Sequence, residues 1–244
     1  MATREDMLRA VRNALKKKGQ MAEPPMAHSL PPLNDLMPPI PAEKLFGQFE
    51  TELIALGCKS YRASELTELW GILRTILEGL EARSVVVSRN PLLFQLNLPE
   101  TLRQWGTSVA EWPGSAATAS SQTEIQTFRA DCFRADAGIT GADFALAETG
   151  SFILTSFTEG SQLASLAPPV HIVLYRRSQI RASLDEILPN LPVSTDSSRP
   201  SPARSVVFVT GTSRTADIEQ VLVRGVHGPR EVHAILVEES CLAS

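Results

Sequence analysis

The sequence contains few of the residues that build metal and cluster sites. Its three cysteines, Cys58, Cys132 and Cys241, lie too far apart for a Cys-x-x-Cys motif. Its four histidines show no His-x-x-x-His spacing. We therefore expect no metal site and no cofactor in this chain, iron–sulfur clusters included. The cysteines are expected to be small, buried, hydrophobic side chains.

Basic charge, nucleotide-binding loops and long apolar runs are also scarce. The 23 basic and 27 acidic residues give a net charge of -4, whereas a nucleic-acid-binding surface needs clustered basic charge. No Gly-x-Gly-x-x-Gly or Walker loop is present. The apolar stretches run to only a few residues and the N-terminus lacks the apolar core of a secretory signal. We expect no nucleic-acid partner, no membrane span and a cytoplasmic location.

The residues that are present predict one α/β domain. Hydrophobic residues make up 43% and charged residues 20% of the chain, as in an ordinary globular protein. Near-continuous apolar runs separated by helix-like stretches predict a mostly parallel sheet covered on both faces. The expected helices cover 42–56 and 64–80 and begin at Pro99, Thr123 and Ser183, the last two with capping boxes. The expected strands are 85–87, 144–147, 152–155, 170–175, 206–210 and 232–237, the second and third forming a hairpin.

The N-terminal segment is expected to be an arm outside this domain. Residues 4–18 have apolar side chains at helical spacing, with Thr3 and Asp6 as a cap. Seven prolines between Pro24 and Pro41 predict an extended linker. We assign 1–19 to the amphipathic helix, 20–42 to the proline-rich linker and 43–244 to the α/β domain. The helix has no core of its own, so we expect it to dock on the main domain, on another protein or on a second copy as a homo-oligomer.

The loop around Gly211 is the first candidate for a ligand site, since ligands of open α/β sheets bind beyond the carboxyl ends of the strands. Gly211 allows close approach of the backbone, and the hydroxyls of Ser213 and Thr215 can hold an oxyanion. Arg214 can clamp a carboxylate or phosphate with two hydrogen bonds. In the alternative interpretation Ser213 and Thr215 cap a helix that begins near Asp217, and the loop is only a polar turn.

The glycine-flanked turn at His227 is the second candidate. Its imidazole titrates near neutral pH and could exchange a proton with a bound acid, although turn histidines are usually structural. We expect this turn, Gly228 included, to join the loop 211–215 in one anion-binding site. A short helix over 217–223 would connect the two, with Arg214 as the fixed charge and His227 as a pH-dependent donor.

The turn between the two hairpin strands is the third candidate. A carboxylate at Glu148, between apolar strands, would have a raised pKa and could act as nucleophile or base. Thr149 beside it is a candidate anion-binding residue. The alternative is a solvated hairpin turn. His171, at the start of a predicted strand, is expected to make one hydrogen bond at the end of the sheet.

Four strings in the sequence carry a family resemblance: Gly141–Ser151, Pro168–Ile172, Thr210–Glu219 and Gly225–Pro229. Together they resemble the lactate-utilisation protein C family, whose shared unit is called the LUD domain, over about residues 43–240. Thr212 stands where the family usually has proline, which makes the loop less rigid. The resemblance implies a fold similar to that of sugar-phosphate isomerases and CoA transferases, the NagB/RpiA/CoA-transferase-like fold.

The resemblance also implies a function. The chain would be the non-iron–sulfur component of a bacterial system that oxidises L-lactate to pyruvate, with iron–sulfur clusters only on separate partner subunits and a small carboxylate or other anion as ligand. Two alternatives stay open. One is a stand-alone enzyme acting on a phosphorylated or CoA-linked substrate with Glu148 as nucleophile or base, and the other is a regulatory ligand-binding module. Glu148 and His227 are the candidate catalytic residues.

Overall fold

The computed structural model describes residues 3–18, 40–114, 121–192, 203, 205–216, 222–224 and 228–242. For 14–18, 214–216 and 222–224 the description covers the backbone alone. The chain divides into two units, Met1–Pro39 and Ile40–Ser244.

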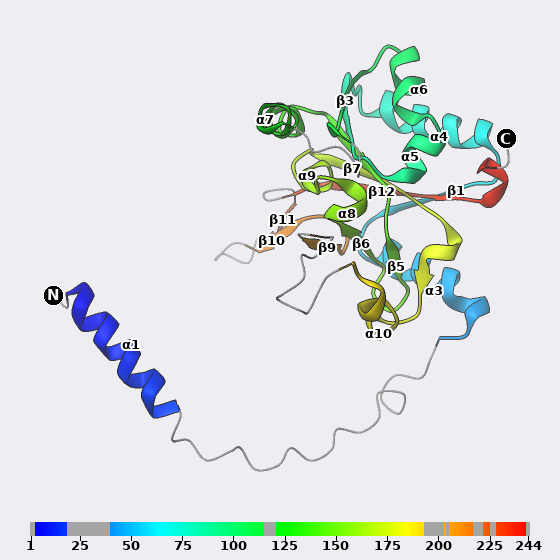
Figure 1. Ribbon diagram of the computed structural model, residues 1–244. Helices are drawn as coiled ribbons and strands as arrows, with labels where there is room; N and C mark the ends of the chain where they lie inside the picture. Colours follow the sequence, from blue (N-terminus) through cyan, green and yellow to red (C-terminus); the bar gives the residue numbers. More distant parts are fainter. Residues whose placement is uncertain are drawn as a thin grey trace. The chain divides into compact units, whose positions relative to one another are not determined.

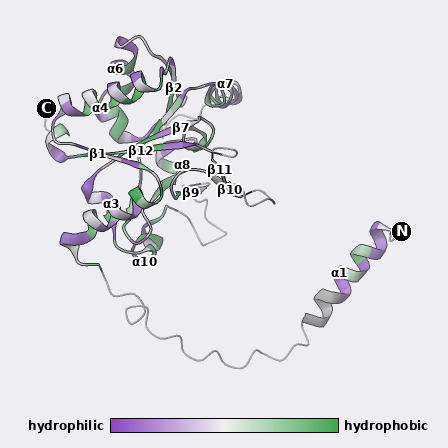
Figure 2. Ribbon diagram, turned by 180° about the vertical axis from the view of Figure 1, so that it is seen from behind, coloured by the Kyte–Doolittle hydropathy of each residue, from purple (hydrophilic) through white to green (hydrophobic). Residues whose placement is uncertain are grey.

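The first unit contains helix α1 (Arg4–Lys18), where the sequence predicts a helix. Its cap is the predicted one: the Asp6 amide donates to Thr3 Oγ1 at 3.3 Å, and the Asp6 carboxylate accepts from the Thr3 amide at 3.0 Å. Hydrophobic and hydrophilic residues alternate along α1 (Figure 2), and Met7, Leu8 and Val11 are exposed. Residues 19–39, which hold most of the predicted linker, lie outside the described residues, and the predicted domain boundaries stay predictions.

The second unit is built on a six-stranded sheet whose strand pairs are all parallel. The strands, in spatial order, are β1 (Lys59–Ala63), β12 (Glu231–Val237), β7 (Val170–Tyr175), β4 (Ala137–Thr140), β2 (Ser84–Val87) and β3 (Ser108–Glu111). All residues of β7 and β4 are buried, because both faces of the sheet are covered. The predicted α/β class with a mostly parallel sheet is confirmed.

Helices cover both faces of this sheet (Figure 1). The first face carries α4 (Leu66–Gly79), α5 (Pro91–Gln95), α6 (Leu98–Gln104) and the 3-10 helix η4 (Glu239–Leu242). The second face carries α3 (Leu45–Ala55), preceded by η1 (Ala42–Lys44), and α7 (Gln122–Cys132), α8 (Ser156–Glu159) and α9 (Leu163–Leu166). The predicted helices at 42–56 and 64–80 and the one near Pro99 are confirmed.

A second, four-stranded sheet packs on the α3 side. Its strands, in order, are β8 (Ile180–Arg181), β5 (Phe144–Leu146), β6 (Ser151–Thr155) and β9 (Val206–Val209). The segments around it are η2 (Arg177–Gln179), α10 (Leu184–Ile187) and η3 (Leu188–Asn190). The β5–β6 hairpin is confirmed. Phe49, Phe152 and Tyr175 join α3, the small sheet and β7, with ring centroids 5.1–5.4 Å apart.

One premise of the sequence interpretation is wrong. β9 pairs antiparallel with β6 in the small sheet, so the loop after it is not at the carboxyl edge of the parallel sheet. The apolar character of 206–209 predicts a strand but contains no information about which sheet the strand joins. The rule that ligands bind beyond the carboxyl ends of parallel strands therefore does not support a ligand site at Gly211.

Three local predictions also need correction. The N-cap of α7 is Ser121, which forms a capping box with Glu124, two residues before the cap predicted at Thr123. Ser183 precedes α10 but makes no side-chain cap bond there, and the Glu186 carboxylate accepts from the Ala182 amide. A helix over 217–223 is excluded at its end, where β11 (Leu222–Arg224) pairs antiparallel with β10 (Arg214–Ala216). Residues 217–221 lie outside the described residues.

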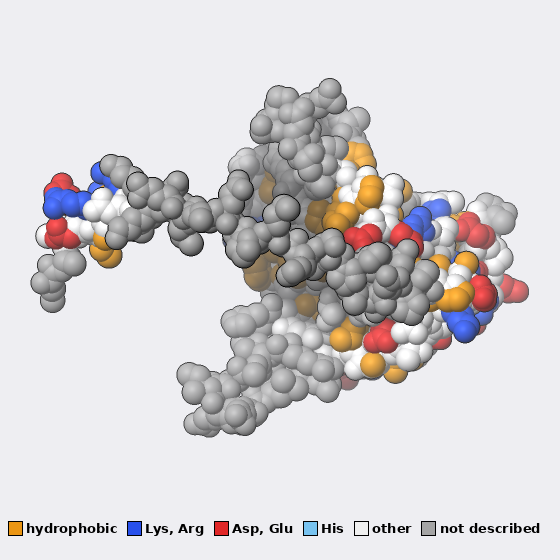
Figure 3. All heavy atoms as spheres, turned by 90° about the horizontal axis from the view of Figure 1, so that it is seen from below, with side chains coloured by type: hydrophobic (Ala, Val, Ile, Leu, Met, Phe, Trp, Pro, Cys, Tyr) orange, Lys and Arg blue, Asp and Glu red, His pale blue; other side chains and the backbone are white. Residues whose placement is uncertain are grey.

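The cysteines and the charged surface agree with an ordinary globular fold. All three cysteines are buried, and burial raises the pKa of the Cys132 thiol to about 12. Acidic and basic side chains lie interspersed on the face shown in Figure 3. No described helix is long and apolar enough to cross a membrane. Within the described part of the chain, no group of three or more His, Cys, Asp and Glu side chains could hold a metal ion.

Candidate functional site

Two glycines hold the hairpin turn and the β9 loop against the end of α3. Gly150 has φ +64°, and a Cβ there would lie 2.5 Å from the Leu53 amide nitrogen. Gly211 has φ +78°, and its Cβ would lie 2.8 Å from Leu56 Cβ. A residue with a side chain would be strained at either position and would push the loop away from the helix.

A chain of hydroxyl groups joins these two loops. The Thr149 hydroxyl donates to Ser151 Oγ at 2.8 Å, and Ser151 Oγ lies 2.8 Å from Thr210 Oγ1. The contact follows from the sheet register, in which β6 runs antiparallel to β9. Two segments that are 59 residues apart in sequence are thereby adjacent.

The β9 loop and the turn before β12 enclose a cavity of about 440 Å³. The Ser213 amide donates to the Pro229 carbonyl at 2.9 Å, and a Cβ at Gly228 would lie 3.2 Å from Ser213 Cβ. Five residues of the cavity wall are glycines or carry hydroxyl groups that suit an anion, and we call them the hydroxyl site: Thr210, Gly211, Thr212, Ser213 and Gly228. The structure thus brings together three predicted site residues, Gly211, Ser213 and Gly228.

Thr212 contributes a buried hydroxyl without a partner. The residue is 6% exposed, and its Oγ1 has no hydrogen-bond partner among the described residues. Such a group costs on the order of 1–3 kcal/mol when it is left unsatisfied. The sequence interpretation names Thr212 only as a departure from a family pattern and assigns it no role.

Glu148 occupies a different place from the one expected of a nucleophile. Its side chain is half-buried, and Oε1 accepts from the Leu184 amide at 3.1 Å, at the start of α10. Among the described residues, those that line the cavity do not include it. Its catalytic role stays a prediction. So do the roles of Arg214 and Thr215, whose side chains are not described, and of His227, which lies outside the described residues.

His171 is placed as the sequence predicts. The side chain is fully buried, and its Nε2 lies 2.8 Å from Thr140 Oγ1, the one hydrogen bond of the ring among the described residues. Burial lowers its pKa to about 3. The ring is therefore neutral at physiological pH and contributes no charge to the sheet.

The sequence interpretation misses a buried carboxyl group at the carboxyl edge of the parallel sheet. Glu159, at the end of α8, is fully buried and accepts from Ser88 Oγ at 2.5 Å, from Asn90 Nδ2 and from the Gly141 amide at 3.3 Å. Burial raises the pKa of Glu159 to about 7. Asp143 is half-buried, and the loss of solvent around its carboxylate raises its pKa too.

The Glu159 carboxyl group lies between β2 and β4, the two strands whose following connections run toward opposite edges of the sheet. β2 leads to β3 on one side, and β4 leads to β7 on the other, so the gap between β2 and β4 is the topological switch point. The segment 88–90 directly follows a correctly predicted strand, and the carboxyl-end rule would have pointed to it. No sequence signal marks Glu159, because only the tertiary fold brings it there.

Together these features define a class: an α/β protein with a doubly covered parallel sheet, a small antiparallel sheet on one face and a hydroxyl-lined cavity beside it. The family model described as "LUD domain" matches residues 46–237. The chain belongs to the LUD domain family.

Relatives and one solved structure extend this result. The chain is 31% identical to "Lactate utilization protein C" of Halalkalibacterium halodurans over 67% of this chain and 66% of that protein. It is 25% identical to "Lactate utilization protein C" of Exiguobacterium sp. over 98% of this chain and 97% of that one. The crystal structure of a DUF162 family protein from Deinococcus radiodurans matches with a TM-score of 0.53 and 25% identity, covering 82% of this chain and 99% of that one.

Proposed function

We propose that this chain is a cytoplasmic, non-iron–sulfur component of a bacterial system that oxidises L-lactate to pyruvate. The observation that carries the proposal is the family match over residues 46–237, joined by relatives named "Lactate utilization protein C". The match to the relative from Exiguobacterium runs along nearly the whole of both chains, so the transfer rests on more than a shared fragment.

The hydroxyl site is the proposed place for the small carboxylate. The Thr212 hydroxyl is buried and has no partner among the described residues, and Thr210 and Ser213 also belong to the wall of the same cavity. Hydroxyl donors of this kind can bind a carboxylate oxygen, and L-lactate offers a carboxylate and a hydroxyl on neighbouring carbons. Arg214 is the proposed charged clamp of this site.

Growth on L-lactate tests the function. Deletion of the gene, in a strain without another lactate dehydrogenase, should abolish growth on L-lactate as sole carbon source. The wild-type gene should restore growth, whereas Thr212→Val should restore it poorly because the ligand loses a hydrogen bond. Thr75→Val, an exposed threonine on α4 whose hydroxyl donates to the Gly71 carbonyl, is the matched control and should restore growth fully. Normal growth of the deletion strain would overturn the proposal.

The proposed partners are iron–sulfur subunits. The three cysteines of this sequence are isolated, so the clusters that accept electrons from lactate would belong to separate proteins. A tagged chain purified from cells grown on L-lactate should bring down cysteine-rich iron–sulfur proteins. Replacement of Leu8 by Glu on the exposed apolar side of α1 tests whether that helix makes the contact. Recovery of the tagged chain alone under gentle conditions would contradict the partner proposal.

A further inference from the structure

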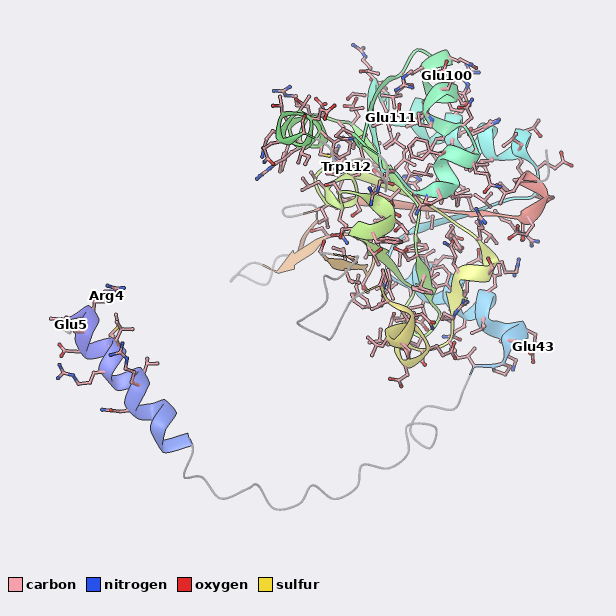
Figure 4. All side chains as sticks on the ribbon, viewed as in Figure 1. Arg4, Glu5, Glu43, Glu100, Glu111 and Trp112 are labelled. Atoms are coloured by element: carbon pink, nitrogen blue, oxygen red, sulfur yellow. The ribbon has the colours of Figure 1, made fainter. Side chains whose placement is uncertain are left out.

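A second cavity, of about 540 Å³, lies at the carboxyl edge of the parallel sheet. It shares no lining residue with the hydroxyl site among the described residues. Arg89 follows β2, and Glu111 and Trp112 lie at the end of β3 (Figure 4). Its wall also includes Phe94, Phe157 and Thr158, and we call it the aromatic cavity. The site is therefore on the edge where α/β sheets bind ligands, next to the switch point between β2 and β4.

Three aromatic rings from three different elements form its apolar wall. Phe94 of α5 is 47% exposed and Phe157 of α8 is 45% exposed, although both are large hydrophobic side chains. Trp112 is half-buried, and its ring packs closely on Gly160, where a Cβ would lie 2.5 Å from Trp112 Cδ1. Exposed aromatic faces around a cavity favour a planar, apolar ligand.

Arg89 adds a positive charge that has no acidic partner among the described residues. Its Nη2 donates to the Phe157 carbonyl at 2.6 Å and approaches the Ser156 carbonyl at 3.4 Å. Within the described residues it forms no salt bridge, whereas the acidic residue of the cavity wall, Glu111, is paired with Arg103. A guanidinium has five N–H donors, so donors remain for an anionic group.

The buried carboxyl group of Glu159 holds this arginine in place. The side chains of Ser88 and Asn90, on either side of Arg89, both bond to its carboxyl group. The Arg89 amide donates to the Glu159 carbonyl at 3.2 Å. Residues 88–90 thus all form hydrogen bonds with Glu159 of α8. The Arg89 guanidinium bonds to the carbonyls of Ser156 and Phe157 in the same helix. A charge held in this way loses little conformational entropy when a ligand binds.

We propose that the aromatic cavity binds an organic anion with a planar aromatic body. The ring system lies between Phe94, Trp112 and Phe157, and the anionic group bonds to the guanidinium of Arg89. A volume of about 540 Å³ is within the range of small-molecule sites. The proposal is independent of lactate utilisation, because it rests on a different cavity and on different residues.

A pair of probes that differ only in charge tests the proposal. The probes are 2-naphthoate and its neutral analogue 2-naphthylmethanol, titrated into the full chain by calorimetry and by quenching of tryptophan fluorescence. We expect saturable binding of 2-naphthoate, roughly 10- to 100-fold tighter than binding of the alcohol. Arg89→Gln should remove this preference and leave the alcohol unchanged. Phe94→Ala should weaken both probes alike.

A control variant separates the site from the rest of the surface. Arg74→Gln removes an exposed arginine of α4 that pairs with Glu78 and should leave both affinities unchanged. If Arg89→Gln does not fold, the wild-type protein still decides the question: added potassium chloride should weaken 2-naphthoate and not the alcohol. Absence of saturable binding, equal affinity for the two probes or equal effects of Arg89→Gln and Arg74→Gln would overturn the proposal.

Discussion

The hydroxyl site and the aromatic cavity are two candidate ligand sites of opposite construction. The hydroxyl site is lined by short sequence segments rich in Gly, Ser and Thr, and it lies beside the small antiparallel sheet. The residues of the aromatic cavity are dispersed between positions 89 and 158, with no motif, and the parallel sheet brings them together. A motif therefore marks a local loop, whereas a site at the edge of a parallel sheet is visible only once the strand order is known.

The two sites also differ in their electrostatics. The described lining of the hydroxyl site contains no titratable side chain and offers hydroxyls and backbone amides. The aromatic cavity has a cation, Arg89, that forms no salt bridge within the described part of the chain, and the segment that carries Arg89 is bonded to the buried acid Glu159. The first suits a small, strongly hydrated carboxylate, and the second suits a larger aromatic anion.

The largest effect on stability is expected at Gly138, where strand β4 packs against helix α9. A Cβ at Gly138 in β4 would lie 1.8 Å from the Ala164 carbonyl oxygen of α9, and backbone atoms cannot yield as a side-chain end can. Gly138→Ala should cost about 3 kcal/mol or more of unfolding free energy, measured by urea denaturation. Gly71→Ala on α4, where nothing lies within 4 Å, should instead stabilise by about 0.5–1 kcal/mol. Equal stability of the two variants would show that β4 and α9 are not packed as described.

The second prediction concerns pH at the carboxyl edge. Because burial raises the pKa of Glu159 from 4.5 to about 7, the folded protein keeps a proton that the unfolded chain has released. The proton on Glu159 contributes up to about 3 kcal/mol to the free energy of unfolding. This contribution is complete below pH 4.5 and is lost as pH rises through 7. His171, with a pKa of about 3 when folded, acts in the opposite direction below pH 6.5. The wild type should therefore be compared with Glu159→Gln, which removes only the first contribution.

Between about pH 5 and pH 7 the wild type should lose roughly 2 kcal/mol relative to Glu159→Gln. Urea unfolding at each pH measures the difference. Asp143, whose pKa burial also raises, keeps its own contribution in both proteins. Parallel pH profiles for wild type and variant would mean that Glu159 is ionised in the folded state.

The third prediction distinguishes a cap from a nucleophile at Glu148. Its carboxylate accepts from the Leu184 amide, so Glu148→Ala should cost about 1 kcal/mol. Glu148→Gln keeps an acceptor oxygen and should cost less. Both genes should support growth on L-lactate if the residue is a cap. Loss of growth with Glu148→Gln, at unchanged stability, would restore the catalytic interpretation.

The smallest effect on stability is expected in the hydroxyl site. Thr212→Val removes a buried hydroxyl that has no described partner, and the replaced side chain has nearly the same shape. The free energy of unfolding should therefore change by less than about 1 kcal/mol. In thermal unfolding the midpoint temperature should stay the same or rise slightly. A clear destabilisation would show that the hydroxyl has a structural partner and is not reserved for a ligand.

Local patterns predict the elements of this fold better than their assembly. The apolar run 170–175 and the helix periodicity of 64–80 match β7 and α4 closely. The strands β1, β3 and β4 are missed, because their sequences lack the unbroken run of β-branched apolar residues that marks β2. The helix expected over 217–223 fails at β11, where strand pairing overrides local propensity.

The candidate site shows the same division. Gly211, Ser213 and Gly228 are found because glycines and hydroxyls mark tight, polar turns that are encoded locally. Glu159 and Arg89 are missed because their roles depend on contacts between distant segments. The carboxyl group of Glu159, for example, bonds to side chains 69–71 residues away in sequence. The neighbours of a buried carboxyl group are known only when the strands that carry them are in place.

The most direct test of the account is a titration of the isotope-labelled protein with L-lactate, followed by nuclear magnetic resonance at the backbone amides. The account predicts saturable shifts at Gly211, Ser213 and Gly228, with none at Arg89 or Trp112. The same shifts should need much more L-lactate in Thr212→Val. Absence of saturable shifts, or shifts centred on Arg89, would contradict the assignment of the small carboxylate to the hydroxyl site.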